Sequence, residues 1–283
     1  MTKRIATSWG FAALLCFSSG FAYAGCSKLP DLENRVEGGS ECLVIKTLRS
    51  TIAEQKPVLV VFLHGSVSRS GPADYFFRHA ERWANDMTGV IAVALLRPGY
   101  ADRDGNESSG NHLQRRDIGW SKNVDSVAKA LEKLKTHHDA GKLVVVGHSA
   151  GAAYAGAMLG KFPGLIDSAI LVSTTCDADL FYRAHFWGGA PANESTLKYA
   201  DKVPKNTQVI FFTGSNDGFT PISLARSCHE TLLTNGVRSS LYEVANAGHD
   251  FDNKMYESPE FVSAMKSVLT VHSGGNAGER VAR

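Results

Sequence analysis

The sequence predicts an α/β fold, with a mostly parallel central sheet and helices on both faces. Short apolar runs rich in β-branched residues alternate with longer segments whose apolar residues recur at helical spacing. Most of the runs are apolar at nearly every position, which is typical of strands buried on both faces. The 283 residues are 43% hydrophobic and 20% charged, a composition that excludes disordered, collagen-like and coiled-coil chains.

Seven of the apolar runs are predicted strands, and five of the longer segments are predicted helices. The strands are expected at residues 42–48, 58–63, 90–95, 143–146, 169–172, 209–212 and 241–244, and the helices at 73–85, 124–137, 150–161, 222–234 and 259–271. The polar stretch 31–40 is assigned no element. Residues 97–120 and 173–205 are irregular, and connections of that length in a compact domain are often functional.

The first 24 residues have the layout of a secretory signal peptide. Lys3 and Arg4 precede an apolar stretch, and a run Ala-Tyr-Ala ends at Ala24, after which we expect cleavage. Ser18, Ser19 and Gly20 interrupt the apolar stretch, so no integral membrane span is expected. The protein is therefore predicted to be secreted or periplasmic. The alternative is a bacterial lipoprotein signal, in which Cys26 would carry the lipid.

Four cysteines follow the signal, an even number in a chain bound for an oxidising compartment. Of the three possible pairings we favour Cys26 with Cys42 and Cys176 with Cys228, because each pair joins segments that the predicted fold brings together. The alternative is four buried free thiols. The sequence has no CxxC pair and no Cys/His cluster, so no metal site is expected.

The charge balance gives no reason to expect a polyanionic partner. The chain has 30 Lys+Arg against 28 Asp+Glu, a formal net charge of +2, and removal of the signal would leave it neutral. A protein that neutralises many phosphates needs a basic surface, so nucleic acid and anionic lipid are not predicted partners. Residues 272–283 are expected to form a flexible tail, and the oligomeric state stays open.

A G-x-S-x-G motif at residues 147–151 lies between a predicted strand and a predicted helix. A sharp turn in this context presents the serine hydroxyl above the edge of the sheet, next to a helix N-terminus that favours negative charge. Ser149 is therefore the candidate nucleophile. The alternative is an ordinary turn.

A serine nucleophile needs a base, and the base needs a carboxylate that fixes its tautomer. Asp217 follows the strand predicted at 209–212, and His249 follows the strand predicted at 241–244. Parallel strands bring such loops to one edge of the sheet, so Asp217 and His249 are the candidate acid and base. The alternatives are a turn aspartate and a surface histidine, and Asp250 is a neighbouring carboxylate.

Attack on a carbonyl creates an oxyanion, which backbone N–H groups stabilise. Ala150 follows the nucleophile, and Ser66 follows His64 and Gly65 after an early predicted strand, where the glycine allows a close turn. The N–H groups of Ala150 and Ser66 are the candidate oxyanion-hole donors, and His64 is expected to shape the loop by hydrogen bonding. The alternative is that His64 and Gly65 merely end a strand.

These motifs resemble the α/β-hydrolase superfamily over residues 58–271. Residues 212–221 resemble its acid loop, 248–251 its histidine loop, and 97–100 the segment after its fourth strand. The resemblance implies an α/β-hydrolase fold in a single domain, residues 25–271, with acyl-enzyme chemistry and no cofactor.

Specificity in this superfamily usually comes from a cap, which is here a short insertion at about 173–205. Its aromatic residues Tyr182, Phe186 and Trp187, together with Tyr100, are candidate substrate-binding residues for an apolar or aromatic acyl group. The alternative is that these rings pack the core of the insertion itself.

The triad and the resemblance together predict an exported serine hydrolase that cleaves a small-molecule carboxylic ester through an acyl-enzyme intermediate. A serine peptidase of the prolyl-oligopeptidase type uses the same triad and is the first alternative. A non-catalytic binding protein that keeps the hydrolase fold is the second.

Overall fold

The computed structural model describes residues 26, 31–67, 71–190, 193–250 and 253–270. Its strands are β1 (Arg35–Gly38), β2 (Glu41–Arg49), β3 (Val58–Leu63), β4 (Val90–Leu95), β5 (Lys142–His148), β6 (Ser168–Val172), β7 (Gln208–Gly214) and β8 (Arg238–Val244). Its α-helices are α1 (Phe77–Asp86), α2 (Ser121–His137), α3 (Ala150–Lys161), α4 (Ala178–Ala184), α5 (Ile222–Thr234), α6 (Asn253–Tyr256) and α7 (Pro259–Leu269). The predicted signal peptide, 1–24, and the predicted tail, 272–283, lie outside the described residues.

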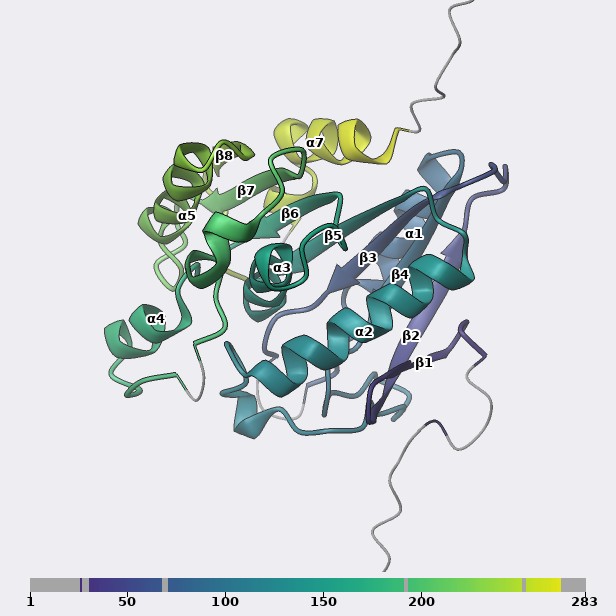
Figure 1. Cartoon of the computed structure of the whole chain (residues 1–283), viewed down its shortest axis with the longest axis horizontal. Helices are drawn as coiled ribbons and strands as arrows, with labels where there is room; N and C mark the ends of the chain where they lie inside the picture. Colours follow the sequence, from purple (N-terminus) through teal and green to yellow (C-terminus); the bar gives the residue numbers. More distant parts are fainter. Residues whose placement is uncertain (1–25, 27–30, 68–70, 191–192, 251–252, 271–283) are drawn as a thin grey trace, which may run out of the picture.

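The strands form one sheet in the order β1-β2-β4-β3-β5-β6-β7-β8 (Figure 1). From β4 to β8 in this order, all neighbouring strands are parallel. At one edge of the sheet, β1 pairs with β2 and β2 pairs with β4 in antiparallel orientation. The predicted α/β fold with a mostly parallel sheet is confirmed. The carboxyl ends of β3, β5, β7 and β8 therefore lie along one edge of the sheet.

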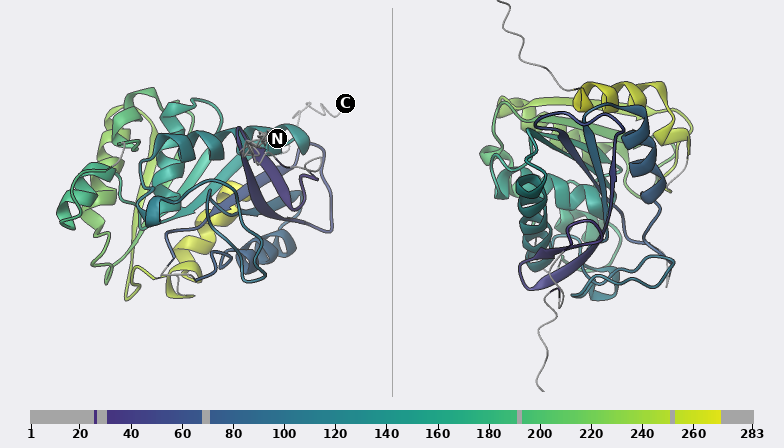
Figure 2. Two further views of the ribbon diagram at one scale, coloured as in Figure 1. Left: turned by 90° about the horizontal axis from the view of Figure 1, so that it is seen from below. Right: turned by 90° about the vertical axis from the view of Figure 1, so that its right-hand side faces the viewer.

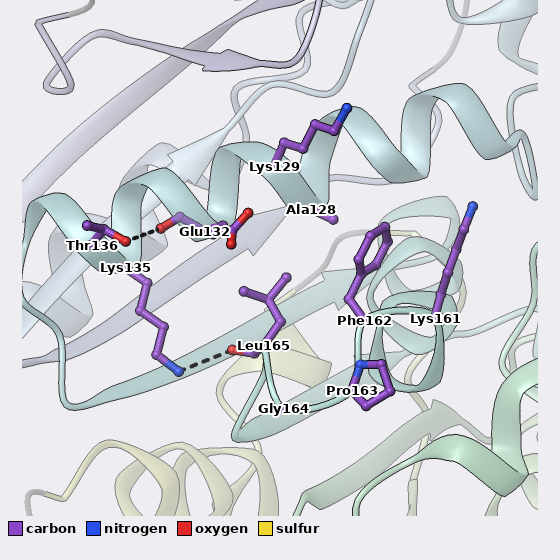
Figure 3. Close-up of a pocket in the computed structure, with 10 residues that line it drawn as sticks. All are labelled: Ala128, Lys129, Glu132, Lys135, Thr136, Lys161, Phe162, Pro163, Gly164 and Leu165. Atoms are coloured by element: carbon purple, nitrogen blue, oxygen red, sulfur yellow. Dashed lines mark hydrogen bonds between the residues drawn. The ribbon is translucent and has the colours of Figure 1, made fainter.

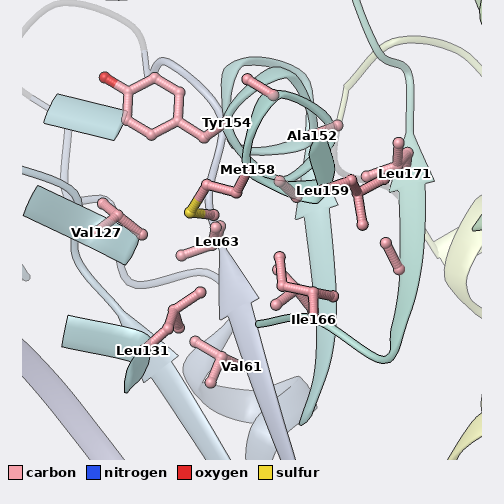
Figure 4. Packing of buried hydrophobic residues seen from close by; sticks show 14 of the residues in the cluster. Val61, Leu63, Val127, Leu131, Ala152, Tyr154, Met158, Leu159, Ile166 and Leu171 are labelled. Atoms are coloured by element: carbon pink, nitrogen blue, oxygen red, sulfur yellow. The ribbon is translucent and has the colours of Figure 1, made fainter. Parts of the chain in front are cut away.

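Helices cover both faces of this sheet (Figure 2). On one face, Val61 and Leu63 of β3 belong to a buried cluster with residues of α2, α3 and α5 (Figure 4). On the other face, Val60 and Phe62 of the same strand belong to a cluster with residues of α1 and α7. Because successive side chains of a strand point to opposite faces, a strand covered on both sides must be apolar throughout.

The structure differs from the sequence-based expectation in several elements, among them β1, α1, α4 and α6, a four-residue helix in a segment for which no element is expected. The polar stretch 31–40 contains β1, a short strand at the edge of the sheet. Its residues are only alternately buried, with Val36 in the core, so the stretch shows no continuous apolar run. α1 begins at Phe77, four residues later than expected, because the chain before it is held in a non-helical connection, where the Ala73 N–H donates to the carbonyl oxygen of Ala101 at 2.8 Å. α4 forms within the stretch expected to be irregular, where Asp177 caps its N-terminus.

Both favoured disulfides are present in the structure. Cys26 is bonded to Cys42 with an S–S distance of 2.03 Å, and Cys176 to Cys228 with an S–S distance of 2.04 Å. The second bond ties the segment after β6 to α5. Among the described residues, none of the helices combines the length with the apolar composition that crossing a membrane requires.

Candidate active site

Ser149 lies in the tight turn between β5 and α3. Its φ of 52° and ψ of −117° lie outside the usual regions for a residue with a side chain, so the turn is strained. A Cβ atom on Gly147 would lie 2.5 Å from the carbonyl oxygen of Gly151, and a Cβ atom on Gly151 would lie 2.1 Å from the carbonyl oxygen of Leu63. Glycines at 147 and 151 therefore let strand, turn and helix pack closely enough to form this elbow.

His249 and Asp217 continue a hydrogen-bonded row that begins at Ser149. His249 Nε2 is 3.1 Å from Ser149 Oγ, and His249 Nδ1 is 3.0 Å from Asp217 Oδ2 and 3.1 Å from Oδ1. Because an ionised carboxylate only accepts hydrogen bonds, Nδ1 carries the imidazole proton and Nε2 accepts from the serine hydroxyl. The structure thus brings together the three residues singled out as nucleophile, base and acid.

Thr220, which the sequence analysis did not single out, holds the carboxylate of Asp217. The N–H and the hydroxyl of Thr220 each donate to this carboxylate at 2.7 Å, and the Phe219 N–H donates at 3.1 Å. Burial by itself would raise the pKa of Asp217, but the hydrogen bonds from His249 and Thr220 outweigh it and lower that pKa to about 2. Asp217 is therefore ionised at neutral pH. An Asp-x-x-Thr pattern just before a helix is the sequence signal for this contact.

The acid loop and the histidine loop touch where β7 ends. A Cβ atom on Gly214 would lie 2.2 Å from the carbonyl oxygen of Ala247, so only glycine allows this approach. The N–H of Asn216 donates to the same carbonyl oxygen at 2.9 Å. These contacts set the spacing between Asp217, which directly follows Asn216, and His249, which lies two residues after Ala247.

The expected oxyanion donors lie on either side of the nucleophile. Ala150 is the first residue of α3, where N–H groups have no carbonyl partner within the helix. The loop after β3 packs against the elbow, since a Cβ atom on Gly65 would lie 2.9 Å from Ser149 Cβ. Ser66 follows in this loop and is exposed, and its Oγ accepts a hydrogen bond from Tyr100 at 3.4 Å.

A buried ion pair braces the loop after β3. Arg97 Nη1 lies 2.6 Å from Asp117 Oδ2, with both side chains fully buried, and Arg97 Nε donates to the carbonyl oxygen of His64 at 2.9 Å. His64 Nδ1 is 2.7 Å from the carbonyl oxygen of Gly65, and the Arg97 N–H donates to His64 Nε2 at 2.9 Å. Burial and the nearby Arg97 charge hold the pKa of His64 well below its usual value, so the ring is neutral.

A hydrogen-bond chain that the sequence analysis missed joins this loop to the backbone of His249. The Gly65 N–H donates to Tyr75 Oη, which lies 2.9 Å from His148 Nδ1, and His148 Nε2 lies 2.9 Å from the carbonyl oxygen of His249. Because a carbonyl only accepts, Nε2 carries the proton. Burial and the neighbouring His249 lower the pKa of His148 to about 4, so Nδ1 is unprotonated and accepts from Tyr75.

The four candidate substrate-binding residues have different surroundings. Tyr100 is buried, with the Arg97 guanidinium 4.7 Å from its ring centre, and Tyr182 is buried in a cluster with residues of α3. Trp187 is 42% exposed and Phe186 is 97% exposed. Tyr100 and Tyr182 are thus packed inside the protein, Trp187 is partly accessible, and Phe186 projects into solvent.

Comparison with known proteins agrees with this geometry. The family model for the alpha/beta hydrolase fold matches residues 58–191. The chain has the α/β-hydrolase fold. The superfamily resemblance seen in the sequence is therefore confirmed, and no curated protein sequence matches the chain.

Three solved structures illustrate the likeness of this fold to that of other proteins. It is similar to acylaminoacyl peptidase from Pyrococcus horikoshii, with a TM-score of 0.65 and 14% identity over 85% of this chain, which spans only 42% of the peptidase. It is also similar to Est1E from Butyrivibrio proteoclasticus, solved with ferulic acid bound, with a TM-score of 0.60 and 14% identity over 83% of this chain and 96% of Est1E. Esterase PE8 aligns with a TM-score of 0.55 and 17% identity over 80% of this chain and 99% of its own.

The protein also has a surface cavity of about 550 Å³ between α2 and the connection from α3 to β6 (Figure 3). Lys129, Lys135 and Lys161 line it, but Lys135 is paired with Asp167 at 3.0 Å and Lys161 with Asp125 at 2.6 Å. None of the triad residues lines this cavity. In the part of the chain that the structure describes, no group of three or more His, Cys, Asp or Glu side chains is arranged to hold a metal ion.

Proposed function

We propose that this protein is an exported serine hydrolase that cleaves carboxylic esters through an acyl-enzyme intermediate. The observation that carries the proposal is the row of hydrogen bonds from Asp217 through His249 to Ser149, at 3.0 and 3.1 Å. The strained backbone of Ser149 is further support, because strain of this kind is concentrated at functional sites. The fold is shared with esterases and with a peptidase, which supports a hydrolase.

The proposed reaction begins when Ser149 Oγ attacks the ester carbonyl carbon while His249 Nε2 takes the serine proton. The negative charge that develops on the carbonyl oxygen is stabilised by the N–H groups of Ala150 and Ser66. His249 then donates its proton to the leaving alkoxide, and the acyl group stays on Ser149. A water molecule, deprotonated by His249, attacks the acyl carbon, and His249 then returns this proton to Ser149 Oγ as the acid is released. Asp217 keeps His249 in the reactive tautomer and stabilises its protonated form.

Export is supported by the covalent structure. Two disulfides persist in an oxidising compartment and are rare in the cytosol. The Sγ atom of Cys26 is bonded to Cys42. A sulfur atom in a disulfide cannot also carry the lipid of a lipoprotein. We therefore propose a signal peptide over residues 1–24 with cleavage after Ala24, rather than a lipid anchor.

The test is to treat the purified, oxidised protein with a fluorophosphonate probe and to locate the adduct by mass spectrometry. Labelling at Ser149, abolished in Ser149→Ala and accompanied by turnover of p-nitrophenyl esters, is the expected result. Faster cleavage of a prolyl-peptide amide than of the esters would instead favour the peptidase, which the likeness to acylaminoacyl peptidase makes the second candidate. A folded protein that is not labelled would be a binding protein on a hydrolase fold.

A further inference from the structure

Aromatic rings form a continuous strip from His249 to the segment after α4. The Phe219 ring lies 4.8 Å from the His249 ring, in an edge-to-face arrangement. The Trp187 ring lies 5.9 Å from Phe219, and His185 contacts both, at 4.7 Å from Phe219 and 5.2 Å from Trp187. We call His249, Phe219, His185 and Trp187 the aromatic strip. Its spacings are those of direct ring-to-ring contacts.

The outer part of the aromatic strip is both accessible and held in place. Trp187 is 42% exposed and Phe219 is half-buried, whereas Phe181 behind them is buried and contacts their rings at 5.8 and 5.3 Å. The backbone N–H of Trp187 donates to the Tyr182 carbonyl oxygen at 2.9 Å, and the backbone carbonyl oxygen of Trp187 accepts from Arg116. Because the rings are fixed before a ligand arrives, binding costs little conformational entropy.

The aromatic strip stands next to the reacting groups. Phe181 packs with Ala150 and Ala153 of α3 in one buried cluster, and Phe219 packs against the same cluster. Ala150 directly follows Ser149, and the inner end of the strip is His249 itself. A substituent of an ester held at Ser149 therefore reaches these rings within a short spacer.

We propose that Trp187 and Phe219 bind an aromatic ring of the substrate, so that the preferred substrates are esters that carry an aryl group on a short spacer. This inference rests on the proposed esterase function and specifies its substrate class. A cyclohexyl ring fills a similar volume but has no π-system to interact with the indole and phenyl rings. The aryl group belongs either to the acid or to the alcohol, and matched substrates distinguish the two.

The test compares the methyl esters of phenylpropanoic and cyclohexylpropanoic acid for the acid side, and phenylethyl with cyclohexylethyl acetate for the alcohol side. The protein should prefer the aryl ester of at least one pair by about three- to tenfold in kcat/KM. Trp187→Leu and Phe219→Leu should bring this ratio close to one. Tyr242→Leu, which removes a similarly exposed ring (39%) from β8, is the matched control and should leave the ratio unchanged.

A ratio near one for both pairs in the unmodified protein would overturn the inference, as would a preference that depends on Phe186 rather than on Trp187. A binding measurement separates this result from failure of the esterase proposal. Ser149→Ala protein is titrated calorimetrically with phenylpropanoate and cyclohexylpropanoate for the acid side, and with phenylethanol and cyclohexylethanol for the alcohol side. Tighter binding of the aryl compound of either pair that is lost in Trp187→Leu supports the aryl site even if no ester is turned over, and equal binding within both pairs contradicts it.

Discussion

Replacing Asp217 with asparagine keeps the size of the side chain and removes its charge. Asp217 accepts from four donors, namely the N–H groups of Phe219 and Thr220, the Thr220 hydroxyl and Nδ1 of His249. The amide of an asparagine would direct N–H groups at one or more of these donors. His249 then loses the acceptor that keeps its proton on Nδ1. Nε2 therefore no longer stays unprotonated, as it must to accept the proton of Ser149. We expect kcat for a p-nitrophenyl ester to fall by about ten-thousandfold.

The same substitution should lower the stability. The pKa of Asp217 lies at about 2 instead of 3.8, and at about 1.4 kcal/mol per pKa unit the ionised carboxylate contributes about 2 kcal/mol to the free energy of unfolding. Because the folded pKa is the lower one, this contribution is complete above the pKa of the unfolded chain and is lost as the pH falls from about 4 to about 2. Urea unfolding of Asp217→Asn should show a loss of about 2 kcal/mol at pH 7, and a smaller difference from the unmodified protein at about pH 3.

Asp250→Asn is the matched control, because Asp250 is an exposed carboxylate next to His249. It should retain its activity and its stability at pH 7. A kcat for Asp217→Asn within tenfold of the unmodified protein would refute the assignment of Asp217 as the acid. A large loss in Asp250→Asn would transfer that role to Asp250.

Three further predictions concern the elements around the site. Tyr75→Phe interrupts the hydrogen-bond chain through His148 and should lower kcat about tenfold with little change in KM, whereas an unchanged kcat would exclude a positioning role for the chain. Replacing both Cys176 and Cys228 by serine opens a loop of 52 residues and should lower the free energy of unfolding by about 4 kcal/mol in urea, and a loss below about 1 kcal/mol would contradict the loop-entropy argument. Gly151→Ala should reduce the thermal stability although alanine favours helices, because its Cβ would lie 2.1 Å from a backbone oxygen of β3, and a higher Tm would refute this.

The elements that the sequence predicted well are those whose signal is local. The buried strands β3 and β4 and the helices α3 and α5 have the expected bounds, because apolar runs and helical spacing are properties of neighbouring residues. The elbow at Ser149 was equally visible, since its G-x-S-x-G motif is five consecutive residues between an apolar run and a helical segment. β1 escaped notice because an edge strand of four residues buries too few side chains to show a pattern.

The partners of the candidate catalytic residues depended on contacts between distant segments. Tyr75 contacts His148 only because the connection after β3 folds back over the end of β5, and Phe219 meets Trp187 only because the insertion after β6 packs against the acid loop. Neither of these two contacts produces a periodic pattern in the sequence. The sequence therefore predicted the chemistry of the candidate site but not the groups that position it.

Phe186 and Trp187 show where the sequence reached its limit. As adjacent aromatic residues in one insertion they were equivalent candidates for substrate binding. In the structure, Phe186 adopts a φ of 58°, a turn that leaves its ring 97% exposed and directs Trp187 back against Phe181 and Tyr182.

The order of Ser149, Asp217 and His249 after separate strands was determined by the sequence alone, because parallel strands carry their loops to one edge. Which neighbouring ring faces that edge was decided by the tertiary structure, since one backbone turn in a loop reverses the direction of a side chain.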